Sequence, residues 1–259
     1  MRPAPRLICV ILCTGLTVMW WVAGNSSASF PDPQRVERAV RAFEIADAGK
    51  PANDGGVVCV GSSSIAGWRE TARKDFAPLP VVTRGIGGGT MNDALHYVDR
   101  MVLRHHPHSV VLYAGENELA DGVSPVQVRD TFQAFAAAVH AKLPGTRIFV
   151  ISIKPSPARA ALWPKMAQTN RLLREVCATD PRLEYVSVVE GMLGADGKPR
   201  PELFRADHLH MNARGYAAWR DAVRPRVLRH HAAFVKAHQL PAGDESRAAV
   251  SIPEGDSHS

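Results

Sequence analysis

Short apolar runs rich in β-branched residues alternate with longer segments of helical periodicity from residue 33 onward, and this alternation constrains the fold most. Near-continuous apolar runs are typical of parallel strands that are buried on both faces. The runs that fit this description are Val57 to Gly61, Val81 to Ile86, Ser109 to Tyr113, Arg147 to Ile153 and Leu183 to Val189. The expected helices are Pro33 to Ala48, Met91 to His105, Pro125 to Lys142, Ala158 to Ala178 and Asn212 to Phe234. The pattern therefore predicts a three-layer α/β/α sandwich with a five-stranded parallel sheet.

The length and composition favour one catalytic or binding domain with a segment on either side of it. A chain of 259 residues, 46% of them hydrophobic, suits a single compact α/β domain, which we place at residues 29–239. Residues 240–259 are dominated by Pro, Gly, Ser, Asp and Glu, so we expect a disordered tail. The sequence Gly255-Asp256-Ser257 in this tail follows no apolar strand and is a chance match to a catalytic motif.

Residues 1–28 have the pattern of an export signal. Arg2 and Arg6 precede an apolar run from Leu7 to about Gly24, and small polar residues follow it. The run approaches the roughly 18 to 20 residues that span a bilayer, so a cleaved signal peptide and an N-terminal membrane anchor both stay open. In either case we expect the domain to be periplasmic or extracellular.

The charge and the histidines argue against two classes of function. The formal charge of +6 is spread along the chain rather than gathered in Lys/Arg blocks, which does not favour nucleic-acid binding. The histidines in two clusters lack matching carboxylate or cysteine partners, so we expect surface histidines and no metal site. These are His105, His106, His108, His230 and His231.

Two cysteines, Cys59 and Cys177, lie within the expected domain. One falls in a predicted buried strand and the other late in a predicted helix, and the pair has no framework spacing. Two buried free thiols are favoured, while a disulfide stays open in an oxidising compartment.

Polar and glycine-rich segments follow three of the predicted strands, at the edge of an α/β sheet where sites usually form. The segments are Gly61-Ser62-Ser63-Ser64-Ile65, Arg84-Gly85-Ile86-Gly87-Gly88-Gly89-Thr90 and Ala114-Gly115-Glu116-Asn117-Glu118. A fourth segment, Asp207-His208-Leu209-His210, precedes the last predicted helix. A dinucleotide loop is disfavoured because Thr90 occupies the last glycine position of G-x-G-x-x-G.

Together these segments supply the groups that acyl transfer needs. A serine hydroxyl is the nucleophile, His210 is the base, and Asp207 orients the imidazole. The backbone N–H groups of Ser63 and Gly88, with the side-chain amide of Asn117, are candidate oxyanion donors.

The four segments resemble blocks I, II, III and V of the SGNH/GDSL hydrolase superfamily, over roughly Val57 to Val227. Block I of that family reads Gly-Asp-Ser, often with a tryptophan seven residues after the glycine, and Gly61 and Trp68 preserve this register. The resemblance implies that Ser63 is the nucleophile of a Ser63–Asp207–His210 triad and that Gly88 and Asn117 serve the oxyanion hole. It also implies a flavodoxin-like fold.

The same resemblance implies a serine esterase without cofactor or metal that works through an acyl-enzyme. Its substrates would be short acyl esters, acetylated glycans or lysophospholipids. The segment Lys154 to Pro157, with Trp163, is expected to form one wall of the cleft. A non-catalytic envelope module that binds glycans or lipids on the same fold is the alternative.

Three positions depart from the family pattern. Ser62 stands where block I usually has Asp, Gly89 where block II commonly has Asp or Ser, and Glu118 where block III commonly ends in Asp. Each position belongs to the scaffold of the site, so we expect an effect on the hydrogen bonding around the nucleophile turn.

Overall fold

The computed structural model describes residues 28–50 and 55–237. The expected tail, and the export segment up to residue 27, lie outside the described residues. Within the described ranges, no helix is both long and apolar enough to cross a bilayer.

The sheet has five strands, all parallel, in the order β2-β1-β3-β4-β5. Their bounds are β1 (Val57–Gly61), β2 (Val81–Gly85), β3 (Ser109–Tyr113), β4 (Arg147–Ile151) and β5 (Leu183–Val186). The predicted parallel α/β/α architecture is confirmed, and the strand order is that of flavodoxin-like folds. In this order the chain reverses direction across the sheet between β1 and β3, which is where such folds place their sites.

Helices surround the sheet, and short 3-10 helices (η) join several of them. Their bounds are η1 (Pro33–Val36), α1 (Glu37–Asp47), α2 (Ser63–Asp75), α3 (Met91–His96), α4 (Val98–Met101), η2 (Leu103–His105), α5 (Glu116–Ala120), α6 (Pro125–Lys142), η3 (Pro157–Leu162), α7 (Trp163–Cys177), α8 (Val189–Met192), η4 (Pro201–Leu203) and α9 (Ala213–Ala237).

Three predicted helices are divided, the one over residues 33–48 into η1 and α1, and the helices α2, α5 and α8 were not predicted. The expected helix over residues 91–105 is three short ones, and the one over 158–178 is η3 followed by α7. Pro164 falls in the first turn of α7, a position that proline favours because no N–H partner is needed there. Helix α2 was missed because three serines and Gly67 obscure its apolar positions Ile65, Trp68 and Ala72, all buried.

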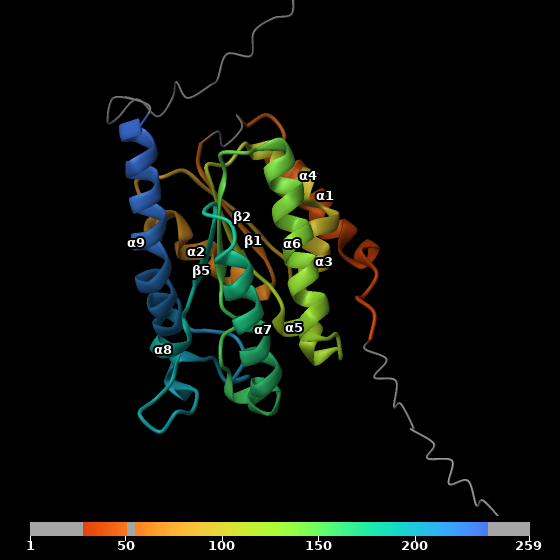
Figure 1. Ribbon diagram of the computed structural model, residues 1–259, viewed down its shortest axis with the longest axis vertical. Helices are drawn as coiled ribbons and strands as arrows, with labels where there is room; N and C mark the ends of the chain where they lie inside the picture. Colours follow the sequence, from red (N-terminus) through yellow and green to blue (C-terminus); the bar gives the residue numbers. More distant parts are fainter. Residues whose placement is uncertain (1–27, 51–54, 238–259) are drawn as a thin grey trace, which may run out of the picture.

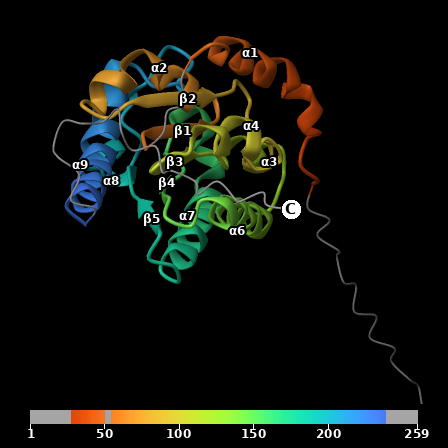
Figure 2. The same ribbon diagram turned by 90° about the horizontal axis from the view of Figure 1, so that it is seen from above.

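The helices cover both faces of the sheet (Figures 1 and 2). Alternate residues of a strand point to opposite faces. Val58 and Val60 of β1 accordingly pack in a core with α1, α3, α4, α6 and α7, whereas Val57 and Cys59 pack in a core with α2, α8 and α9.

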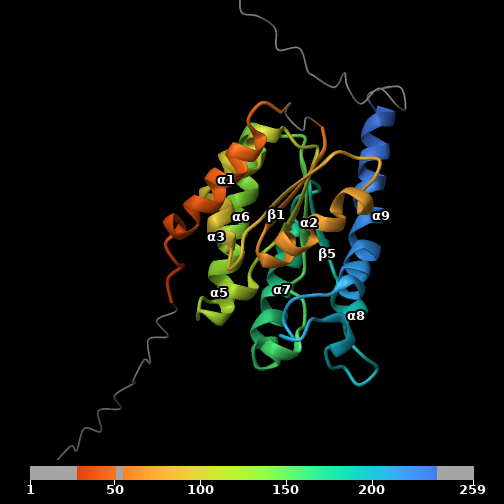
Figure 3. The ribbon, with the colours of Figure 1, turned by 180° about the vertical axis from the view of Figure 1, so that it is seen from behind.

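Buried aromatic side chains join α2 to α9, the helices that follow the candidate nucleophile and the candidate base. The rings of Trp68 and Trp219 meet edge to face with centroids 5.5 Å apart, and Tyr113 of β3 lies 4.7 Å from Trp219. Figure 3 shows α2 and α9 beside each other on this face. Such aromatic pairs add roughly 0.5–1.5 kcal/mol each beyond the area they bury, so this contact holds two distant segments together.

Both cysteines of the described residues are free and buried. Cys59 lies in the core under α2, α8 and α9, and Cys177 lies in the core on the opposite face. Burial raises the pKa of the Cys177 thiol to about 12. The favoured reading of two buried thiols agrees with this arrangement.

Candidate active site

The turn between β1 and α2 presents Ser63 at the carboxyl edge of the sheet. Gly61 has φ of +139°, and a Cβ atom there would lie 1.9 Å from the Tyr113 carbonyl oxygen, so only glycine fits. The N–H of Ser62 donates to that carbonyl at 3.0 Å. Ser63 then begins α2 and is partly buried. Backbone geometry therefore fixes where its hydroxyl lies.

The structure brings Ser63, His210 and Asp207 into one hydrogen-bonded row. His210 Nε2 lies 3.0 Å from Ser63 Oγ, and His210 Nδ1 lies 2.6 Å from Asp207 Oδ2. The first of these contacts joins residues 147 positions apart in the chain. The geometry matches a nucleophile, a base and a group that orients the base.

The loop that carries Asp207 and His210 is held largely by its own atoms. Asp207 Oδ1 accepts from the N–H groups of Leu209 and His210, both at 2.9 Å. The His210 side chain and then these two N–H groups lower the pKa of the Asp207 carboxyl. The N–H of Arg205 donates to the His210 carbonyl at 2.7 Å. Asp207 therefore stays ionised and its direction is set locally.

The turn after β2 holds Gly88, which is exposed and has φ of +68°. It is tied to the β1 turn because the N–H of Ile86 donates to the Gly61 carbonyl at 2.9 Å. Arg35 of η1 donates to the Gly88 carbonyl at 3.1 Å and forms two bonds of 2.7 Å to Asp93 of α3. An arginine from the start of the domain thus anchors the loop that carries a candidate oxyanion donor.

The turn after β3 holds Asn117, partly buried in the first turn of α5. Its Nδ2 atom donates to the Gly89 carbonyl at 3.0 Å, and its Oδ1 atom accepts from Arg159 Nη2 at 3.1 Å. The turns of Gly88 and Asn117 therefore flank that of Ser63, because β2 and β3 are the two neighbours of β1.

The contacts of Glu118 explain one departure from the family pattern, the glutamate that stands where block III commonly ends in Asp. Its side chain is fully buried, with one oxygen accepting from the Met91 N–H of α3 and the other from the Gly115 N–H at 3.0 Å. It therefore joins the turns that follow β2 and β3. Burial raises the pKa of the Glu118 carboxyl to about 7.

A buried ion pair lies behind Asn117. Lys154 Nζ is 2.6 Å from Glu116 Oε2, which also accepts from the Tyr113 hydroxyl at 2.9 Å, and Ser156 reaches Glu116 Oε1 at 3.2 Å. The Lys154 side chain is 1% exposed, so it does not line a cleft wall as the sequence suggested. The sequence analysis assigned no role to Glu116 or Arg159. The one available sign of a buried ion pair here was a lysine, Lys154, directly after a predicted buried strand.

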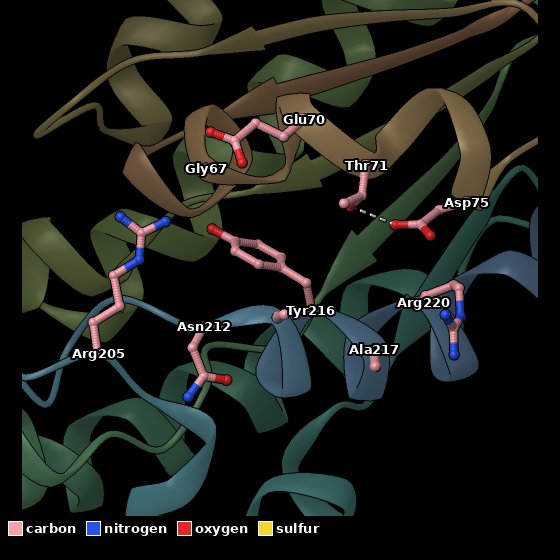
Figure 4. A pocket seen from close by; sticks show the side chains of 10 residues that line it. Gly67, Glu70, Thr71, Asp75, Arg205, Asn212, Tyr216, Ala217 and Arg220 are labelled. Atoms are coloured by element: carbon pink, nitrogen blue, oxygen red, sulfur yellow. Dashed lines mark hydrogen bonds between the residues drawn. The ribbon is translucent and has the colours of Figure 1, made fainter.

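A cavity of about 310 Å³ lies between α2 and the start of α9 (Figure 4). It is lined by Gly67, Glu70, Thr71, Asp75, Arg205, Asn212, Ala213, Tyr216, Ala217 and Arg220. Figure 4 shows the Tyr216 ring lying between the two helices, and its hydroxyl donates to the Ser64 carbonyl at 2.9 Å. The cavity contains none of the predicted site residues.

The described residues include no group of three or more His, Cys, Asp or Glu side chains that could hold a metal ion. The expected surface placement is wrong for His105 and His108, which are both buried. His108 and His230 stack with ring centroids 4.8 Å apart on the α9 face. Burial lowers the pKa of the His230 imidazole.

Comparison with known protein families gives a match that spans the candidate site. A model of the GDSL-like lipase/acylhydrolase family matches residues 50–218, a range that contains all five predicted site residues. A comparison of the sequence with curated proteins gives no match.

Solved structures share the fold. A GDSL-like lipase from Bacteroides thetaiotaomicron has a TM-score of 0.61 and 20% identity, covering 76% of this chain and 98% of that one. A lipase/acylhydrolase from Enterococcus faecalis has a TM-score of 0.55 and 19% identity, covering 67% and 95%. An acetyl xylan esterase from Geobacillus stearothermophilus has a TM-score of 0.53 and 14% identity, covering 69% and 96%.

Proposed function

This chain belongs to the GDSL-like lipase/acylhydrolase family, and on that premise we propose that it is a serine esterase with Ser63 as nucleophile. The observation that carries the proposal is the row from Asp207 through His210 to Ser63, with contacts of 2.6 Å and 3.0 Å. Both distances are short enough for direct proton transfer.

Acylation begins when Ser63 Oγ attacks the ester carbonyl carbon. His210 Nε2 takes the hydroxyl proton, and the ionised Asp207 at Nδ1 holds the imidazole tautomer and stabilises the imidazolium. His210 then returns this proton to the leaving alkoxide as the carbon–oxygen bond breaks. The acyl group remains on Ser63 as an ester.

Deacylation repeats these steps with water. His210 Nε2 takes a proton from water, the hydroxide attacks the acyl carbon, and the proton passes to Ser63 Oγ as the acyl-enzyme bond breaks. The acid product leaves, and no external oxidant, metal or organic cofactor is required.

The negative charge on the carbonyl oxygen is stabilised by the N–H groups of Ser63 and Gly88 and by the Asn117 amide. The turns of Gly88 and Asn117 lie on either side of the Ser63 turn, so donors approach from both sides. Ser63 begins α2, and the positive end of the helix dipole adds to the stabilisation.

The substrate class we propose is carboxylic esters, namely short acyl esters, acetylated glycans or lysophospholipids. The similarity of the fold to a GDSL-like lipase and to an acetyl xylan esterase supports this range. We also propose that residues 1–28 direct the domain out of the cytoplasm, as the basic and apolar pattern of that segment indicates.

The test is hydrolysis of p-nitrophenyl acetate, butyrate and octanoate by the full chain and by Ser63→Ala, each with and without chelator. We expect chelator-resistant turnover that Ser63→Ala abolishes. Ser64→Ala is a matched control, because Ser64 is the adjacent helical serine and it is Ser63 whose hydroxyl lies 3.0 Å from His210 Nε2.

Equal activity in wild type and Ser63→Ala would reject the serine mechanism. No turnover by either protein on these esters, followed by none on acetylated xylan or lysophosphatidylcholine, would favour a non-catalytic binding module.

A further inference from the structure

Arg159 of η3 contacts the block that carries the Asn117 oxyanion donor at two points. Its Nη1 atom donates to the Glu116 carbonyl at 2.6 Å, and its Nη2 atom donates to Asn117 Oδ1 at 3.1 Å. The guanidinium therefore contacts one backbone carbonyl and one side-chain carbonyl on successive residues. Arg159 itself is partly buried.

The segment that presents Arg159 is anchored on both sides of the site. Lys154 and Ser156, just before η3, are buried against the Glu116 carboxylate. The N–H of Ala158 donates to the carbonyl of His208, inside the loop of the catalytic base, at 3.1 Å. Arg159 thus extends from a fixed backbone, and its reach to Asn117 follows from that backbone.

The contact decides which end of the Asn117 amide faces the reacting oxygen. A side-chain amide carries an acceptor oxygen and an NH₂ group with two donors, and the two ends are nearly isosteric. The guanidinium has only donors, so it holds the oxygen end. One Nδ2 hydrogen is used by the Gly89 carbonyl, which leaves the other for an oxyanion.

The charge also strengthens the donor. A cation on the amide oxygen polarises the group, and hydrogen bonds in such a chain reinforce one another. An arginine suits this position better than a lysine because its planar fork reaches two acceptors at once.

We propose that Arg159 is a positioning residue that fixes and polarises the Asn117 amide for oxyanion stabilisation. The proposal rests on the esterase function proposed above and extends it to a residue outside the row of Ser63, His210 and Asp207, one that is bonded to Glu116 and Asn117. Because Arg159 acts through Asn117, its loss should lower turnover for every ester by the same factor and should leave substrate binding unchanged.

The experiment is a double-mutant cycle with the full chain on p-nitrophenyl acetate and butyrate. It compares wild type, Arg159→Met, Asn117→Ala and the double variant, measuring kcat and KM separately. We expect Arg159→Met to lower kcat by on the order of 10- to 100-fold, with KM within about twofold. In the Asn117→Ala background the same change should lower kcat by less than about threefold.

Two further variants keep the result interpretable. Arg171→Met removes an exposed arginine of α7, with a side chain 66% exposed, and should leave both parameters unchanged. Arg159→Lys keeps a positive charge, so its kcat should lie between those of wild type and Arg159→Met. If Arg159→Met does not fold, Arg159→Lys replaces it in the cycle. Thermal unfolding of each variant checks the fold.

Equal losses of kcat in both backgrounds would overturn the proposal. A rise in KM that differs between the two esters would also overturn it, because that result means direct contact with substrate. Activity that survives Ser63→Ala would instead reject the esterase mechanism, and the two failures are therefore distinguishable.

Discussion

The two sides of Ser63 are supported in different ways. On one side, Asp207 and His210 lie on an exposed loop, and the carboxylate is oriented by N–H groups within three residues of it. On the other side, Asn117 rests on buried groups, and its contact with Arg159 spans 42 positions in the chain. The proposed base is therefore positioned by contacts within its own loop, whereas the proposed oxyanion donor is positioned by contacts with the tertiary core.

This contrast predicts which substitutions should affect turnover alone and which should also affect stability. A substitution at Asp207 or His210 should lower turnover without unfolding the domain, because their loop is largely exposed. A change behind Asn117 alters buried charges and therefore affects stability together with turnover. Four variants test this division, in order of decreasing expected effect.

His210→Ala should lower kcat by on the order of 10⁴-fold or more, because both the base and the acid of the cycle are lost. We expect the thermal unfolding midpoint to stay close to that of wild type, since the imidazole is partly exposed. His208→Ala is the control on the same loop, because the structure puts His210 and not His208 against Ser63. A large loss of stability in His210→Ala would contradict the division.

Lys154→Met should lower the free energy of unfolding by about 3–5 kcal/mol, because it leaves Glu116 as a buried carboxylate without its cation. Urea denaturation of wild type and variant measures the difference. The double variant Lys154→Met/Glu116→Gln removes both charges and should recover part of the loss. An unchanged free energy of unfolding in Lys154→Met would show that the buried pair is not needed by the fold.

Asn117→Ala should lower kcat by on the order of 10²- to 10³-fold, the usual effect of removing one oxyanion donor. Stability should change little, because Asn117 is only partly buried and the pair behind it is intact. Steady-state kinetics measures the change in kcat, and thermal unfolding of the same preparation measures the change in stability. Wild-type turnover would remove Asn117 from the site.

Glu118→Gln should alter how stability depends on pH. Burial raises the pKa of Glu118 from 4.5 to about 7, so the folded state holds a proton that the unfolded state releases between those values. The contribution of this group is fully present below pH 4.5 and is lost as the pH rises through about 7. Relative to wild type, Glu118→Gln should therefore become more stable with rising pH in that window, by up to roughly 3 kcal/mol.

Urea denaturation of both proteins at pH 5 and pH 8 measures that difference. Glu202→Gln is a control, because Glu202 is exposed and its pKa is shifted the opposite way by Arg200. A difference between wild type and Glu118→Gln that does not vary with pH would contradict the buried-carboxyl account.

Patterns local to the sequence were enough to predict the fold and to name the candidate catalytic groups. Continuous apolar runs mark the parallel strands, because a strand covered on both faces has no polar side. The observed sheet confirms the predicted fold, and the family match over residues 50–218 confirms the predicted family. Ser63, His210 and Asp207 were named from short motifs, and the spacing of Asp207 and His210 is local enough to be read directly. Their catalytic roles stay predictions until the variants are measured.

The tertiary structure alone decided what supports the oxyanion side. Glu116, Lys154 and Arg159 belong to segments about 40 residues apart, and no local pattern shows that one carboxylate compensates one lysine inside the core. Helix α2 was likewise not predicted, because its serines and glycine have weak helix propensity and its stability comes from tertiary packing, such as that of Trp68 against Trp219. Local motifs specify groups whose partners are near in the chain, whereas buried charges are paired by three-dimensional packing.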